Sequence, residues 1–210
     1  MRGRGWILGL ALSLGWLSAG APGLFAQGDA GSREYQLKAV FLYKICPFVE
    51  WPPNALGNGN TFVIGVLGPD PFGGALETIA ASEKVQGKKI VIQHFPSAKN
   101  YQPCHLLFIS NQPDANAGEK TADDRLKAVL GKTRGTPVLL VGDSTGFALQ
   151  GGMINFYIEE NKLKLEVNPK AAEAVGLKIS SRLLALSVVK VVSTSAARPP
   201  QEPKYHARLS

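Results

Sequence analysis

The residues best suited to nucleophilic or metal chemistry are two cysteines and three histidines: Cys46, Cys104, His94, His105 and His206. A thiol becomes a catalytic nucleophile when a nearby base or cation lowers its pKa, and no such neighbour is evident beside either cysteine. Cys104, His105 and His94 could be imagined as a metal cluster. They lack the short paired spacings of structural zinc sites, and no fourth ligand can be identified. We therefore predict no metal site, and expect His94 and His105 to make ordinary hydrogen bonds at strand ends.

Two glycine-containing segments resemble loops that bind substrates. GDSTGF (142–147) contains a serine but not the G-x-S-x-G turn that exposes a nucleophile. GPDPFGG (68–74) lacks the Lys-Ser/Thr pair of a P-loop. With no catalytic set, we predict a protein that is not an enzyme and has no cofactor. Both segments follow apolar runs that read as strands, and doubly wound sheets bind ligands beyond the carboxyl ends of their strands. The candidate lining of a small-molecule pocket at that edge is Gly68, Asp70, Phe72, Asp143 and Ser144.

The N-terminus has the composition of a secretory signal peptide. MRGRG carries Arg2 and Arg4 without an acid, and the apolar run WILGLALSLGWLSAG ends in small residues. That run is shorter than the roughly 20 residues of a membrane-spanning helix. Because Pro22 disfavours cleavage after Ala21, we predict cleavage after Ala26 and a periplasmic mature chain. Loss of the two arginines lowers the formal net charge from +7 to +5. The remaining charges are scattered, which argues against a nucleic-acid partner.

Export to an oxidising compartment leaves two interpretations of the cysteines. Cys46 and Cys104 could form a single disulfide. Two buried free thiols are the alternative, because cysteine packs well as a small hydrophobic side chain. Spacing alone does not bring the two sulfur atoms together, so both interpretations stay open.

The elements that carry these residues alternate between helices and apolar strands. After a linker at 27–32, a helix is expected at 33–45, and Pro47 should kink or end it near Cys46. Short apolar strands alternating with helices are typical of an α/β domain with a largely parallel sheet flanked by helices, of the doubly wound type. We expect strands at 61–68, 88–95, 104–110 and 136–143, and helices at 72–84 and 119–131, with Gly131 just past the end of the latter.

The first helix is apolar along two stripes, separated by a narrow polar strip that includes Lys38. One stripe contains Leu37, Val40, Phe41 and Lys44, and the other contains Tyr35, Ala39, Leu42 and Cys46. One stripe should pack on the sheet. The other needs a cover from this chain, a second copy in a homodimer, or a receptor. Tyr35, Leu42 and Tyr43 are therefore candidate partner-binding residues.

The last third predicts an antiparallel hairpin. Folding 151–168 about Glu160-Asn161 pairs apolar residues across the ribbon, Phe156 with Leu165 and Ile154 with Val167. Tyr157 and Lys164 on its polar face are two further candidate partner contacts. Two short helices should follow: PKAAEAV, capped by Asn168, and RLLALSVV, capped by Ser180 or Ser181. The proline-rich tail at 193–210 is expected to be disordered.

Two blocks of sequence carry a resemblance to a known family. They are REYQLKAVFLYKICPFVEWP (33–52) and GGMINFYIEENKLKLEVNPKAAEAVGLKISSRLL (151–184). Together with the strands between them, they resemble the YfiR family, also called DUF4154, over residues 33–192. Cys46-Pro47 departs from the family pattern, and the extra cysteine pair of the best known repressor is missing, so its redox behaviour is not carried over.

The resemblance implies a periplasmic protein that binds the periplasmic part of an inner-membrane diguanylate cyclase and represses it. Since the family is large, a small-molecule-binding or sensor protein for another receptor, such as a histidine kinase, is the alternative. Either role fits an exported domain without a catalytic set.

Overall fold

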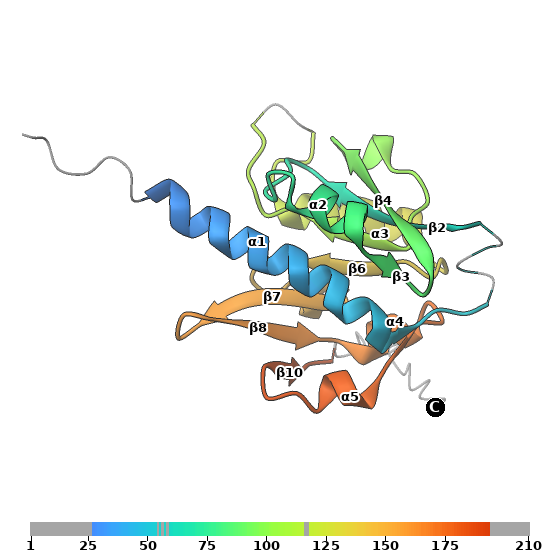
Figure 1. Ribbon diagram of the computed structural model, residues 1–210. Helices are drawn as coiled ribbons and strands as arrows, with labels where there is room; N and C mark the ends of the chain where they lie inside the picture. The colour runs from blue at the N-terminus through green and yellow to red at the C-terminus, as the bar shows by residue number, and fades with distance from the viewer. Residues whose placement is uncertain (1–26, 54, 56, 58, 116–117, 194–210) are drawn as a thin grey trace, which may run out of the picture.

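The computed structural model describes residues 27–193 except 54, 56, 58 and 116–117. The predicted signal peptide, its cleavage site and nearly all of the predicted tail lie outside these residues. The core is an eight-stranded sheet in the order β10-β8-β7-β6-β5-β2-β4-β3, and β1 and β9 form a separate antiparallel pair (Figure 1). The strands are β1 Val49–Glu50, β2 Thr61–Leu67, β3 Lys84–Val85, β4 Lys88–Phe95, β5 Leu106–Ile109, β6 Leu139–Gly142, β7 Ile154–Glu159, β8 Lys162–Val167, β9 Lys178–Ile179 and β10 Val189–Val191.

The centre of the sheet is parallel, as predicted. β4, β2, β5, β6 and β7 pair in parallel, whereas the β7–β8 and β3–β4 pairs are antiparallel. The chain passes from β2 to β4 on one side and then returns to place β5 on the other side of β2. The carboxyl ends of β2 and β5 therefore mark the point where strand order reverses, the usual ligand position in this architecture.

Five α-helices are described: α1 Gln27–Ile45, α2 Ala75–Ser82, α3 Ala122–Thr133, α4 Pro169–Glu173 and α5 Ser181–Leu184. α1 and α2 lie side by side on the near face of the sheet in Figure 1, and α3 lies behind it. Between the two layers, every residue of the central strands β5 and β6 is buried. No helix among the described residues combines the length and hydropathy needed to cross a bilayer.

The predicted hairpin is confirmed in register. Phe156 pairs with Leu165 and Ile154 with Val167 across β7 and β8. Glu160 and Asn161 both have positive φ, 51° and 56°, the signature of a two-residue type I′ turn. This even-numbered turn keeps the apolar side chains of both strands on the same face.

The first helix differs from the prediction at its start and in its orientation. It begins at Gln27, so the six residues expected to form a linker belong to it. Leu37 and Val40 are 44% and 41% exposed, whereas Ala39, Leu42 and Cys46 are fully buried. The stripe that was predicted to contact a partner, which contains Ala39 and Leu42, is therefore the one that packs on the sheet. As predicted, the helix ends beside Pro47, at Ile45, and a 3-10 turn (η1, Cys46–Phe48) follows.

Three further boundaries were predicted incorrectly. α2 begins only at Ala75, because Gly73 and Gly74 adopt positive φ. α3 continues through Gly131 to Thr133, so Gly131 does not terminate it. The last helix is capped by Ser180, as one alternative had it, but ends at Leu184. The valine-rich segment beyond it forms β10, since branched side chains favour the extended backbone and β8 offers a free edge.

Candidate functional site

A buried polar network fastens α1 to the carboxyl edge of the sheet. Lys38 Nζ lies 2.7 Å from Asp143 Oδ2, and the two side chains are only 5% and 1% exposed. The Tyr35 hydroxyl donates to the same Asp143 oxygen at 2.8 Å, and Gln112 Nε2 donates to the Tyr35 oxygen at 3.0 Å. Because Asp143 follows β6 and Gln112 follows β5, the network joins α1 to two neighbouring strand ends. Lys38 had been placed on the polar strip of the helix, and sequence periodicity gave no sign of its partner.

This environment disfavours any additional negative charge. Burial, followed by the charge of Asp143, raises the pKa of the Tyr35 hydroxyl well above its ordinary range. A buried ion pair of this kind has little net stabilising effect compared with apolar residues, but loss of one member is costly, since the other stays buried without a counter-charge. The network therefore fixes the position of α1 and offers no group poised for proton transfer.

Two of the residues predicted to line a strand-end pocket, Phe72 and Asp143, contact Tyr35 of α1. The Tyr35 ring meets the Phe72 ring edge-on at 5.7 Å between centroids, and Phe72 packs in turn on Phe108. The Asp70 carboxylate accepts a hydrogen bond from the Phe72 backbone at 2.8 Å. Ser144 is buried beside Asp143, and its hydroxyl has no hydrogen-bond partner among the described residues. Phe72 lines a cavity of about 470 Å³ in the groove between α1 and α2.

Arg125 on α3 is a buried charge that sequence analysis did not single out. Its NH1 group donates to the carbonyl oxygens of Ser110 and Gln112, both at 2.9 Å, which holds the segment after β5. Its guanidinium lies against Gly68, where an added Cβ would come within 2.6 Å of Nε. Burial lowers the pKa of this guanidinium. Gly68 is therefore needed for space and for its φ of +90°.

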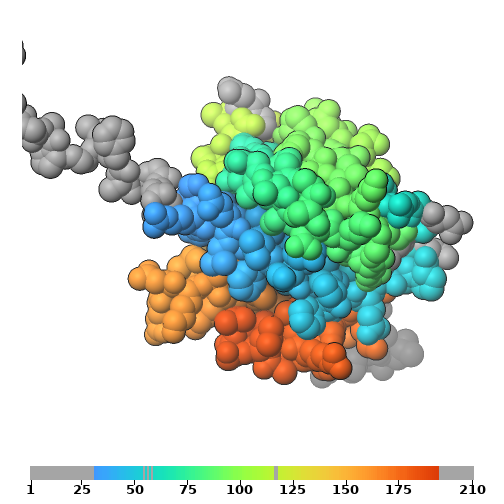
Figure 2. All heavy atoms as spheres, in the orientation of Figure 1, coloured from blue at the N-terminus to red at the C-terminus, as the bar shows by residue number. Residues whose placement is uncertain are grey.

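The candidate partner-binding residues have different surroundings. Leu42 is fully buried in the core, so its proposed contact with a partner is wrong for this fold. Tyr35 is engaged in the network, and the Tyr43 hydroxyl donates to Glu83 on the segment after α2 at 2.8 Å. Tyr157 and Lys164 lie opposite each other on the hairpin, where Lys164 forms an ion pair with Glu159. Figure 2 shows α1, in blue, open to solvent between α2 and the hairpin.

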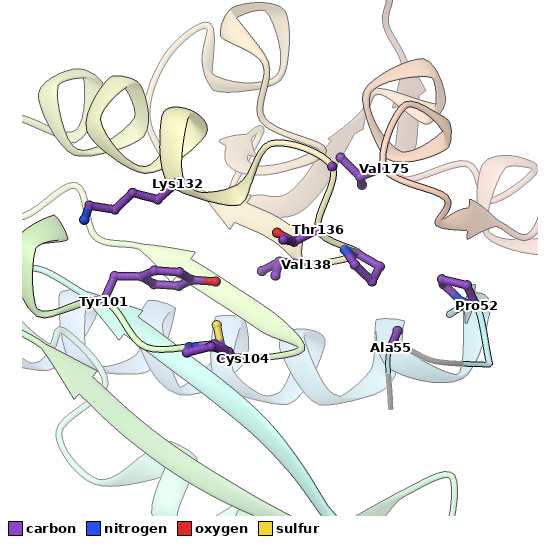
Figure 3. Close-up of a pocket in the computed structure, with 11 residues that line it drawn as sticks. Pro52, Ala55, Tyr101, Cys104, Lys132, Thr136, Val138 and Val175 are labelled. Carbon is purple, nitrogen blue, oxygen red and sulfur yellow. The ribbon is translucent and has the colours of Figure 1, made fainter. Parts of the chain in front are cut away.

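Both cysteines are free and buried, which matches the second of the two alternatives. The Cys46 thiol donates to the Leu42 carbonyl oxygen at 3.1 Å, within α1 and its 3-10 extension. Cys104 lies beside Tyr101 in the wall of a cavity of about 470 Å³ (Figure 3). Burial raises the pKa of each thiol to about 12. Neither cysteine is therefore a thiolate nucleophile near neutral pH.

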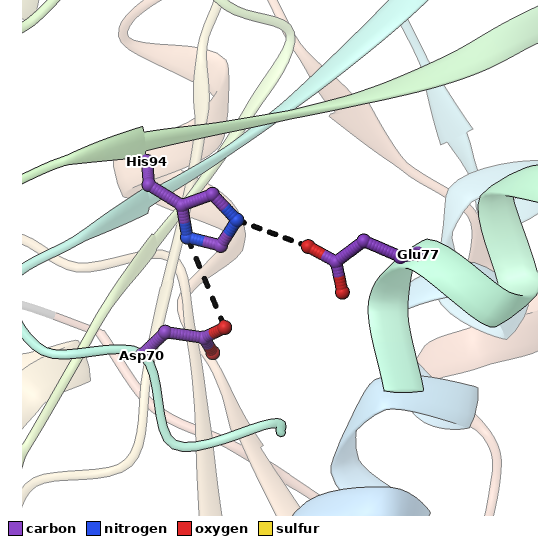
Figure 4. A group of neighbouring side chains, drawn as sticks. All are labelled: Asp70, Glu77 and His94. Atoms are coloured by element: carbon purple, nitrogen blue, oxygen red, sulfur yellow. Dashed lines mark hydrogen bonds and ion pairs between the residues drawn. The ribbon is translucent and has the colours of Figure 1, made fainter. Parts of the chain in front are cut away.

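The two histidines of the core domain do not share a site with Cys104. His105 Nδ1 accepts a hydrogen bond from the Val63 amide at 2.8 Å, and burial lowers its pKa. His94 instead lies between two exposed carboxylates (Figure 4). Its Nε2 is 3.0 Å from Glu77 and its Nδ1 is 3.8 Å from Asp70. One ligand atom from each of Asp70, Glu77 and His94 lies within 4.8 Å of the other two, a spacing that could hold a metal ion, although all three residues are exposed.

Comparison with known proteins identifies the family of this chain. A family model described as YfiR/HmsC-like matches residues 35–188, which run from the start of the α1 network to the edge of β10. The chain belongs to the YfiR/HmsC-like family. The match includes the second of the two sequence blocks that suggested this family and all but the first two residues of the first block. No curated protein matches the sequence.

Two solved structures share part of the fold. One is an ABC domain from Streptococcus pneumonia in complex with L-Trp, at 14% identity and a TM-score of 0.48, covering 75% of this chain and 60% of that one. The other is a conserved domain protein from Vibrio cholerae O1 biovar El Tor, at 14% identity and a TM-score of 0.46, covering 74% and 60%. The YfiR/HmsC-like chain thus spans less than two thirds of either protein, and neither bears on its function.

Proposed function

We propose that this chain is a periplasmic regulator that binds the periplasmic domain of an inner-membrane diguanylate cyclase and holds it inactive. The observation that carries the proposal is the family match, which spans every strand of the sheet except β10 and most of α1. Regulation of diguanylate cyclases is the role associated with this family. Tyr35, Lys38 and Asp143 bond one another and hold α1, and both thiols are buried and protonated. These features suit a binding protein better than an enzyme.

The outward face of α1 is the contact surface that we propose for the receptor. Leu37 and Val40 are large apolar side chains that stand more than two fifths exposed on this helix. The Lys38–Asp143 pair, on the opposite face, holds the helix backbone in place. A rigid surface loses little conformational entropy on binding. Val40 also lines the groove between α1 and α2, so a receptor side chain could insert beside it.

The polar face of the hairpin is a second, separate contact in this proposal. Tyr157 and Lys164 keep the role proposed for them, since both are partly exposed on the described hairpin. Repression then requires only that the receptor's inactive form binds better than its active form. A change from 1% to 99% inactive needs a differential affinity of about 5.5 kcal/mol, which a few apolar anchors could supply.

Photocrosslinking in living cells would test this surface. A photoreactive residue at Val40 should capture a membrane protein that carries a diguanylate cyclase domain, identified by mass spectrometry. The matched control is Leu149, which is 52% exposed in η3 (Phe147–Gln150) and outside the proposed surface. Capture of a histidine kinase would favour the alternative receptor. Equal capture from both positions, or capture of a second copy alone, would contradict the proposal.

A further inference from the structure

Two cavities at the amino-terminal edge of the sheet adjoin each other. The first, of about 470 Å³, is the one walled by Tyr101 and Cys104 (Figure 3). The second, of about 540 Å³, lies between α3 and α4. Gly135 and Val175 line both, so the two form one elongated groove. Each volume is within the range of roughly 300–1,000 Å³ typical of ligand sites.

The floor of this groove is apolar and its rim is cationic. Val138 and Cys104 in the first part, and Leu140 and Met153 in the second, are buried core residues whose side chains form the floor. The rim carries three exposed cations: Lys132, Arg134 and Lys170. Among the described residues that line the two cavities, none is a carboxylate. The groove therefore combines a long apolar surface with positive charge alone.

We propose that this groove binds a free medium-chain fatty acid, with the acyl chain along the floor and the carboxylate at the cationic rim. A short or planar anion would fill only one of the two cavities and leave apolar floor in contact with water. The segment at 194–210 is a poor alternative occupant, because it carries three cations, Arg198, Lys204 and Arg208, against a single acid, Glu202. The inference does not depend on which receptor the protein regulates.

The first test varies the acyl-chain length and the head-group charge of the ligand. The full mature protein is titrated calorimetrically with octanoate, decanoate and dodecanoate, each below its micellar concentration, and Kd is measured. Each added methylene that contacts the apolar floor of the groove should lower Kd about fourfold, since a buried methylene contributes about 0.8 kcal/mol. Dodecanol should bind more weakly than dodecanoate, and dodecyltrimethylammonium more weakly still. An affinity independent of chain length, or equal for all three head groups, would overturn the proposal.

Substitutions locate the site. Ala174→Trp should fill the second cavity and weaken dodecanoate binding at least tenfold. Lys132→Glu should weaken it several-fold, whereas Lys127→Glu, an exposed lysine earlier on α3 that lines neither cavity, should leave Kd unchanged. If Ala174→Trp fails to fold, Lys170→Glu replaces it, because that side chain is exposed. Unchanged binding in the folded variants would contradict the assignment.

Two further measurements separate the groove from a membrane surface. Saturating dodecanoate should protect Cys104 from alkylation at alkaline pH, and leave Cys46, which lies outside the groove, unaffected. Binding to phosphatidylglycerol vesicles without saturable binding of free dodecanoate would indicate a lipid surface and overturn the proposal. Loss of protection at Cys104 despite tight dodecanoate binding would place the ligand elsewhere, with the same consequence.

Discussion

At the scale of single residues, the two thiols behave as packing groups with a predictable effect on stability. Cys46 lies at the helix end, closed off by the core, and Cys104 lies in a cavity wall. For both, burial raises the pKa from 9.0 to about 12. The folded state therefore keeps a proton on each sulfur in a pH range where the unfolded chain has lost it.

The sign of the pH dependence follows from this difference. A raised thiol pKa contributes stability that is complete below pH 9 and is lost as pH rises through the folded pKa. We expect the free energy of unfolding in urea to fall between pH 9 and pH 11, by about 1.4 kcal/mol per pH unit for each thiol. Cys46→Ala should have a shallower fall than the parent chain. Equal slopes for the two proteins, measured from urea unfolding curves, would show that Cys46 is not buried as described.

At the scale of elements, a buried ion pair is one of the contacts that attach α1 to the sheet. Lys38→Met keeps the length of the side chain but leaves the Asp143 carboxylate buried without its cation. We expect a loss of about 3–5 kcal/mol in the free energy of unfolding. The double variant Lys38→Met/Asp143→Asn should recover part of that loss, because the buried side chain at position 143 no longer carries a charge. A loss below about 1 kcal/mol in the single variant, or no recovery in the double variant, would mean that the pair does not hold the helix.

The strands and the hairpin were the elements that sequence alone predicted well. Apolar runs such as 61–68 specify buried parallel strands, and strict alternation around Glu160-Asn161 leaves one register that keeps apolar side chains together. Periodicity failed for α1, because both of its stripes are apolar and composition does not say which one faces the sheet. The deciding contact, Lys38 with Asp143, joins residues 105 positions apart. Likewise, β10 forms because β8 has a free edge beside it, and no local sequence pattern predicts that free edge.

The candidate site was predictable only in part for a similar reason. The loops after β2 and β6 were correctly placed at one edge of the sheet, but their shared contact with Tyr35 of α1 had no sequence signal. The groove beside α3 and α4 had no sequence signal, because it is formed by apolar residues from segments that are distant in sequence.

At the scale of the whole molecule, the proposed contacts are spread over distinct surfaces. The receptor surface is on α1 and the hairpin, whereas the fatty-acid groove lies at the amino-terminal edge beside α3 and α4. The formal net charge of +5 on the predicted mature chain would attract acidic partners at long range. This charge alone does not distinguish one acidic partner from another.

The most direct measurement of the central claim is the cellular level of cyclic di-GMP in a strain lacking this gene. We predict that the level rises on deletion and returns to normal with the wild-type gene. The variant Leu37→Asp/Val40→Asp should fail to restore it, although it folds and reaches the periplasm, whereas the control Leu149→Asp should restore it fully. An unchanged level in the deletion strain would contradict the claim that this protein represses a diguanylate cyclase.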